Sequence, residues 1–353
     1  MPPGRPHRPG ARRVLGWRQR GQGSDPSLGG NRCAGATGWI RDCVSKPFRF
    51  GVSMRGAGSK AEWVTKARRA EALGFSSLVM PDHLIGTRMS VGPALVLAAE
   101  VTTRLRVGSF VFDNDFRHPA VLAQEAATVD VLTAGRFEFG IGAGWMREEY
   151  DKTGIPFVDG GARVDRMAEA LTIIKGLFGD QAVTLNGKHY TVSGLEGTCK
   201  PIQQPHPPIL IGGGGTRLLT IAAAQADIIS IMPRSKRDGS ALEDGDATAA
   251  AFDHKLEVIR DAAGSRFEEL EFNTLVQEVI VTDDAAGAAA KLIGDWKLGV
   301  DEILESPLLL IGTGDQIRQK LRRIRDRLRI SYVTVFEKNM EAMAPVIEPL
   351  LGS

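Results

Sequence analysis

The chain has 353 residues, of which 43% are hydrophobic and 24% charged. This is the composition of a globular protein with a sizeable core. No run approaches the roughly 18 consecutive apolar residues of a membrane span. Its formal net charge of +2 is uneven: residues 1–46 carry nine basic and two acidic side chains, a net +7, which leaves −5 for residues 47–353. The acidic body gives no reason to expect nucleic-acid binding, and two of only three cysteines fall within residues 1–46, which argues against a disulfide-built secreted fold and favours a reducing cytoplasm.

The first segment in chain order, residues 1–46, is rich in Gly, Pro and Arg and has no helical or strand periodicity. Such a segment does not bury enough apolar surface to offset the entropy of ordering it, and it lacks the apolar core of a secretory signal. We predict a disordered leader, either an appendage or upstream sequence read from a misplaced start, with a basic interaction arm as the alternative. The folded domain is expected over residues 47–353, and the functional chain is expected to begin near Val44.

From Phe48 onward, short extended runs alternate with segments of helical periodicity. Alternation of this kind implies parallel strands joined by right-handed crossovers. Eight units in about 300 residues predict a (β/α)8 TIM barrel, with a doubly wound open sheet as the structural alternative. The predicted strands are Phe48–Met54, Ser77–Met80, Leu105–Phe112, Arg136–Ile141, Pro208–Ile211, Asp227–Ile231, Phe272–Val281 and Ile330–Phe336.

The predicted helices fill the intervals between these strands. They lie around Trp63–Gly74, at Val91–Val101, from Pro119 onward, over Val164–Phe178, at Thr216–Gln225, Phe252–Ala263 and Ala285–Trp296, and over Ile317–Leu328. Two short insertions interrupt the pattern, Gly179–Gln204 and the polar stretch Arg234–Asp246. The first is expected to hold a small hairpin that turns at Asn186-Gly187.

Reactive groups of a TIM barrel lie just after the strand ends, and the run Gly212–Gly215 is the clearest candidate there. It follows a strand and opens a helix at Thr216, so its backbone N–H groups and the helix dipole are suited to holding a phosphate. A tight turn without a ligand is the alternative. Neither this run nor Gly140–Gly144 fits the dinucleotide fingerprint, because Arg217 and Trp145 stand where the third glycine belongs.

Asp82-His83 follows the second strand and is the candidate for proton transfer. An imidazole moves protons near neutral pH, although a purely structural histidine is the alternative. No second His or Cys falls at ligand spacing, so no metal site is expected. A cation held by Asp82, Asp113 and Asp115 is a minor alternative.

Two further charged stretches are interpreted more simply. Glu148-Glu149 is expected to be a solvated pair, with a carboxylate at the barrel mouth as the alternative. Arg234–Arg237 is expected to be a solvated loop, and the alternative is a lid that grips an anionic cofactor tail.

Several of these segments also carry a resemblance to a known family. The segments are Arg117-His118-Pro119 through Asp130, Gly135-Arg136-Phe137, Gly140–Trp145, Pro208–Gly215 through Asp227, and Ile311–Ile317 with Val333–Phe336. From Phe48 to Leu351 the chain resembles the luciferase-like monooxygenase superfamily. Within it, the chain looks most similar to the F420-dependent oxidoreductases of actinobacterial type.

This resemblance implies an oxidoreductase that transfers a hydride between deazaflavin F420 and a small organic substrate, with FMN as the alternative cofactor. His83 would handle the accompanying proton, and Phe110-Val111 would form a non-prolyl cis peptide behind the ring. Trp145 stands where F420-dependent sugar-phosphate dehydrogenases have a glutamate, which favours an apolar or aromatic substrate with Trp145 in its pocket. The implied cofactor contacts are Asp82, Phe110, Val111, Asp113, Ala143, Gly144, Gly213, Gly214, Gly215 and Thr216.

Two other functions stay open at this point. One is a two-component FMN monooxygenase supplied with reduced flavin by a separate reductase, and the other is a non-catalytic F420- or flavin-binding protein. The expected setting is a cytoplasmic homodimer that acts on a small molecule, with no nucleic-acid or membrane partner.

Overall fold

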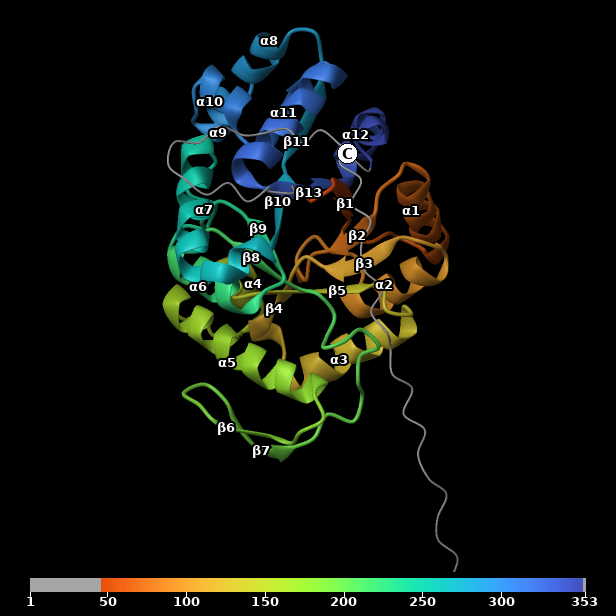
Figure 1. Cartoon of the computed structure of the whole chain (residues 1–353), viewed down its shortest axis with the longest axis vertical. Helices are drawn as coiled ribbons and strands as arrows, with labels where there is room; N and C mark the ends of the chain where they lie inside the picture. The colour runs from red at the N-terminus through yellow and green to blue at the C-terminus, as the bar shows by residue number, and fades with distance from the viewer. Residues whose placement is uncertain (1–45, 352–353) are drawn as a thin grey trace, which may run out of the picture. The chain divides into compact units, whose positions relative to one another are not determined.

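The computed structural model describes residues 46–351 (Figure 1). The predicted leader and the predicted start near Val44 lie outside these residues. Among the described helices, none is both long and apolar enough to cross a bilayer.

Eight parallel strands close on themselves to form the centre of the domain (Figure 1). Their order is β1, β2, β3, β5, β8, β9, β10 and β13, and β13 pairs with β1 to complete the ring. The TIM-barrel prediction is therefore confirmed, and the open sheet is excluded. The strands are β1 Arg49–Ser53, β2 Ser77–Met80, β3 Arg106–Ser109 with its short continuation β4 Phe112–Asp113, β5 Phe137–Gly142, β8 Ile209–Gly213, β9 Ile228–Ile231, β10 Glu271–Val276 and β13 Ile330–Phe336.

Helices on the outside of the ring follow the strands and begin at recognisable caps. Pro119 occupies the first turn of α3, and the Thr313 side chain accepts from Gln316 N–H in a capping box that opens α11, an arrangement that satisfies otherwise unpaired amides. The helices are α1 Lys60–Ala72, α2 Val91–Glu100, α3 Pro119–Leu132, α4 Arg147–Thr153, α5 Gly160–Phe178, α6 Thr216–Gln225, α7 Ala249–Ala263, α8 Ala285–Ala290, α9 Ile293–Trp296, α10 Val300–Glu305, α11 Gly314–Leu328 and α12 Met340–Ile347.

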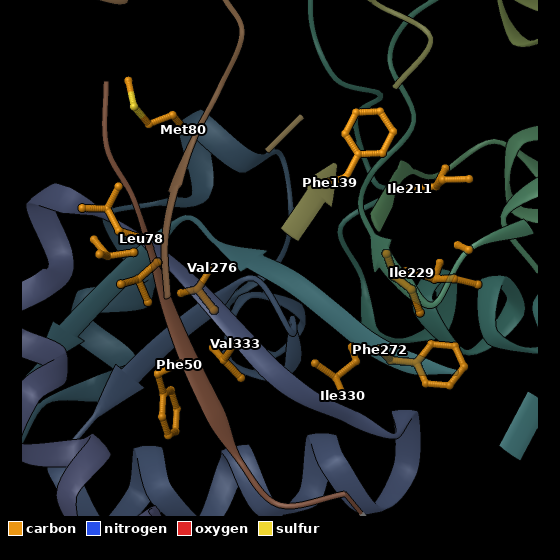
Figure 2. Packing of buried hydrophobic residues seen from close by; sticks show 14 of the residues in the cluster. Phe50, Leu78, Met80, Phe139, Ile211, Ile229, Phe272, Val276, Ile330 and Val333 are labelled. Carbon is orange, nitrogen blue, oxygen red and sulfur yellow. The ribbon is translucent and has the colours of Figure 1, made fainter. Parts of the chain in front are cut away.

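The main hydrophobic core lies between the ring and these helices. Figure 2 shows Phe50, Val333, Ile330 and Phe272 among its fully or almost fully buried side chains, contributed by β1, β13 and β10. Strands covered on both faces are continuously apolar, which explains why short unbroken runs predicted them. Burying this surface is the main source of folding free energy.

A charged network closes the amino-terminal end of the ring. Glu138 is buried and accepts from Arg49 at 2.6 Å and from Arg106 at 2.8 Å, while the Arg49 guanidinium lies 3.5 Å from the centre of the Tyr332 ring. Burial opposes ionisation of Glu138, but the two guanidinium groups hold its pKa below the ordinary value. These side chains occupy the amino-terminal end of the ring, and the cavity described below opens at the opposite end.

Three predicted elements are divided in the structure, and the first, Leu105–Phe112, is split into β3 and β4. The strand predicted over Phe272–Val281 leaves the barrel at Gln277, whose N–H donates to Leu308. The remainder, β11 Glu278–Val281, pairs with the unpredicted β12 Leu309–Gly312 in a separate two-stranded sheet. The helix predicted over Ala285–Trp296 is likewise two short helices, α8 and α9.

The hairpin predicted in the first insertion is present as β6 Val183–Asn186 and β7 Thr191–Leu195. The predicted turn at Asn186-Gly187 is wrong, because Asn186 still belongs to β6 and the four residues 187–190 connect the two strands. The Glu169 carboxylate on α5 accepts from the backbone N–H groups of Lys188, His189 and Tyr190. A side chain from another element therefore holds this turn.

Candidate active site

A cavity of about 560 Å³ opens at the carboxyl ends of the barrel strands. Each of the eight strands of the ring, or the segment directly after it, contributes residues to the wall, as expected for the site of a TIM barrel. The lining residues discussed below are Ser53, Arg55, Asp82, His83, Phe110, Val111, Asp113, Ala143, Gly144, Trp145, Glu149, Arg163, Gly212–Gly215, Met232, Arg234, Leu275, Gln277 and Phe336.

The structure brings the two principal sequence candidates together. His83 and the run Gly212–Gly215 line the same cavity, as do all but one of the residues predicted to contact a cofactor. The exception is Thr216, which is exposed at the first position of α6 and is not part of the wall. Its predicted contact with the cofactor is therefore without support from the cavity.

The four glycines of the run have different surroundings. A Cβ atom at Gly214 would overlap the Met232 carbonyl oxygen, whereas one at Gly215 would meet nothing within 4 Å. Gly215 is the N-cap of α6 and supplies no side-chain cap. The first amides of α6 therefore point their partial positive charge toward open space beside the cavity, which is the arrangement that binds phosphates at helix starts.

His83 is held by a buried carboxylate that the sequence analysis assigned to solvent. Glu149 on α4 has a side chain only 2% exposed, and its Oε2 lies 2.9 Å from His83 Nδ1. Its Oε1 accepts from the N–H groups of Leu84 and Ile85 at 2.6 and 3.0 Å. The expectation of a solvated Glu148-Glu149 pair is thus wrong for Glu149, although Glu148 does lie outside and pairs with Lys152.

The Glu149 carboxylate fixes the orientation of the imidazole. Burial alone would raise its pKa, but the hydrogen bond to His83 and those from Ile85 and Leu84 bring the pKa below the ordinary value. An ionised Glu149 only accepts, so His83 Nδ1 carries a proton and donates it. Within residues 46–351, Nε2 of His83 has no hydrogen-bond partner, and the ring lines the cavity.

Asp82 is engaged by a neighbouring arginine. Arg117 donates to both carboxylate oxygens of Asp82, and Asp113 N–H donates to Oδ2 at 3.2 Å. Arg117 also contacts Glu125 at 3.1 Å. Asp82 therefore anchors the segment after β3, and any contact with a cofactor would be made by a carboxylate that is already paired.

Asp113 is a second ionisable group on the cavity wall. Burial raises the pKa of this carboxyl to about 7, and the nearby Asp115 and Asp82 carboxylates add to the increase. The Tyr150 hydroxyl donates to Asp113 and to Asp115 Oδ2. Gly144, at φ +73°, lies against this group, since a Cβ there would overlap the Tyr150 hydroxyl.

A cation shared by the acidic residues receives no support. Arg117 pairs with Asp82, and Arg166 lies 2.5 Å from Asp115. Within residues 46–351, no three His, Cys, Asp or Glu side chains are grouped as metal ligands.

The third strand bends where the resemblance implies a cis peptide. The Phe110–Val111 bond is cis, between the end of β3 and the start of β4. On the neighbouring wall Trp145 stands edge-on to His83, with ring centres 6.2 Å apart at 86°. Trp145 thus borders the space in front of the imidazole.

Sequence reasoning missed one side of the cavity. Ser53 ends β1 and Arg55 follows it, Leu275 lies near the end of β10 and Gln277 follows it, and Phe336 ends β13. These residues form no motif. The only signal available for them was their position at the ends of predicted strands.

Comparison with known proteins agrees with this architecture. The profile of the family described as luciferase-like monooxygenase matches residues 43–293. The chain belongs to the luciferase-like monooxygenase family. The match ends at residue 293, before α10, β12 and β13.

Solved structures share the fold at low sequence identity. An F420-dependent secondary alcohol dehydrogenase, solved with an F420-acetone adduct, superposes with a TM-score of 0.68 at 18% identity, covering 86% of this chain and 99% of that one. The coenzyme F420-dependent tetrahydromethanopterin reductase of Methanopyrus kandleri gives 0.66 at 17% identity, with coverages of 86% and 99%. A long-chain alkane monooxygenase gives 0.69 at 14%, with coverages of 87% and 91%.

Proposed function

We propose that this chain is an F420-dependent oxidoreductase that transfers a hydride between deazaflavin F420 and a small organic substrate. The observation that carries the proposal is the shared cavity, in which a helix start suited to phosphate and an oriented histidine face the same space. The preference for F420 over FMN rests on the sequence resemblance. A homodimer in the cytoplasm is proposed on the same basis.

The residues present fit a cofactor of this kind. Gly215 leaves open space at the start of α6, and Gly144 keeps the wall beside Asp113 free of a side chain. In the proposed complex the amides of Gly215 and the first turn of α6 hold the phosphate. The residues Phe110, Val111, Asp113, Ala143 and Gly144 border the ring and its polyol chain. When bound, the cofactor supplies the hydride chemistry.

Residues of the chain carry out the proton transfer. Glu149 keeps the proton of His83 on Nδ1, so Nε2 is free to accept a proton from the substrate or, once protonated, to return it. Trp145 stands beside the imidazole and narrows the space around it. This arrangement lets one histidine manage the proton that accompanies hydride transfer in either direction.

Parallel titration of the purified protein with F420 and with FMN tests the cofactor assignment. We expect F420 to bind the more tightly, and we expect His83→Ala to bind it within about twofold of the wild type while losing turnover by roughly 10²-fold or more. Binding of FMN without F420 would replace the proposal by the flavin monooxygenase. Binding of F420 with no turnover of any candidate substrate, and no effect of His83→Ala, would leave a cofactor-binding protein.

A further inference from the structure

The wall that sequence reasoning missed has a composition of its own. It is built from residues at or just after the ends of β1, β10 and β13, and these strands are neighbours in the ring. Leu275 and Phe336 provide apolar surface, and Arg55 provides a positive charge. Gln277 already donates its amide N–H to Leu275.

Arg55 differs from the other arginines of the cavity. Arg163 donates to the carbonyl oxygens of Ala143 and Val158, and Arg234 lies 3.4 Å from Asp246. In the part of the chain that the structure describes, the Arg55 side chain has no carboxylate, carbonyl or aromatic partner. It is exposed, so its charge is available to a ligand.

The acidic residues of the cavity do not neutralise Arg55. Asp82 is paired with Arg117, and Glu149 is paired with His83. Asp113 is buried against Tyr150 on the segment after β3. Within residues 46–351, no carboxylate lies in ion-pair contact with Arg55.

Arg55 and the glycine run lie on opposite walls. β1 and β8 stand four places apart in a closed ring of eight strands (Figure 1). A phosphate held at Gly215 is therefore remote from Arg55. On its own side the Arg55 guanidinium lies beside Gly86, in the loop that follows His83, since its Nη1 would be 2.9 Å from a Cβ at Gly86.

We propose that the substrate is an apolar or aromatic molecule that carries one anionic group, and that Arg55 binds this group. The inference rests on the proposed function in one respect, which is that the substrate shares the cavity with the cofactor. The apolar body would pack on Leu275 and Phe336, in the cavity that His83 and Trp145 also line. A carboxylate is the simplest anion that suits a guanidinium at a cavity rim.

A matched pair of probes, 2-naphthoate and 2-naphthamide, tests the proposal by calorimetric titration. The two have the same aromatic body and differ in charge. We expect naphthoate to bind the wild type roughly tenfold more tightly than naphthamide, the effect of one charge-assisted hydrogen bond at a partly solvated site.

Variants assign this preference to a residue. Arg55→Met should bring the two probes within about twofold of each other, and Arg55→Lys should recover part of the difference. Arg234→Met, which removes a second arginine from the same cavity, should leave the preference unchanged. Equal binding of both probes to the wild type, or a preference that survives in Arg55→Met, would overturn the proposal.

The F420 titration separates the two proposals. The probes are titrated without cofactor, so failure of F420 to bind would not affect their comparison. Should Arg55→Met weaken F420 more than about threefold, Arg55 would belong to the cofactor site and the substrate proposal would be wrong.

Discussion

Asp113 gives folding stability a pH dependence whose sign and size follow from the structure. Burial raises the pKa of its carboxyl from 3.8 to about 7. In the unfolded chain the group ionises near its ordinary value, so the folded state loses stability as pH rises from 3.8 and carries the full penalty above pH 7. The difference between the two pKa values corresponds to roughly 4 kcal/mol.

Asp113→Asn keeps the shape of the side chain and removes the ionisation. Hydrogen bonds lost with Tyr150 and the Asp115 N–H lower stability by an amount that changes little with pH. We therefore expect the unfolding free energy of the variant, relative to the wild type, to increase by roughly 2–3 kcal/mol between pH 5 and pH 8.

Denaturant unfolding followed by tryptophan fluorescence at several pH values in this range measures the difference. Asp261→Asn, which removes an exposed carboxyl from α7, is the control and should give a difference that is flat with pH. A flat curve for Asp113→Asn as well, or one that falls as pH rises, would refute the assignment of a protonated buried carboxyl.

Three further substitutions test other parts of the site and the fold. Glu149→Gln should lower turnover roughly tenfold or more, because the imidazole loses its ionised acceptor. The affinity for F420 should stay within about twofold of the wild type. Unchanged turnover in steady-state assays would mean that the His83–Glu149 pair is only structural. Gly215→Asp should abolish F420 binding in titrations while Gly215→Ala keeps it, since the position has room for a side chain but not for a like charge beside a phosphate; equal affinities would remove the phosphate assignment. Gly214→Asp would be a less specific test of phosphate binding, because any side chain at Gly214 also disturbs the backbone at Met232. Glu138→Gln should lower the unfolding free energy by roughly 2 kcal/mol, because Arg106 loses its carboxylate partner while Arg49 keeps only Glu271. A loss below about 1 kcal/mol in chemical denaturation would contradict this account.

Most of the barrel could be predicted from sequence because its strands are short apolar runs between helical segments. β2, α6 and β13 have the predicted ends, and the other barrel strands, apart from those after Leu105 and Phe272, differ by one or two residues. The break at Gln277 could not be predicted. Whether Glu278–Val281 stays in the barrel depends on pairing with β12, which is distant in sequence.

The sequence predicted those residues of the candidate site whose location follows from their position directly after a strand. Residues directly after parallel strands meet at one end, so His83 and the glycine run were expected together, and they are. Glu149 was missed because two adjacent glutamates look alike in sequence. Only the short helix α4, which is absent from the predicted helices, turns Glu149 under the His83 loop and leaves Glu148 beside Lys152.

The central claim is that one ligand occupies both the start of α6 and the space in front of His83. Titrating ¹⁵N-labelled protein with F420 and recording the backbone amide signals of Gly215 and Arg217 together with the imidazole signals of His83 measures this directly. Our account predicts that both sets of signals shift with the same dissociation constant at one equivalent of cofactor. Shifts at only one of the two places, or saturation at clearly different concentrations, would contradict it.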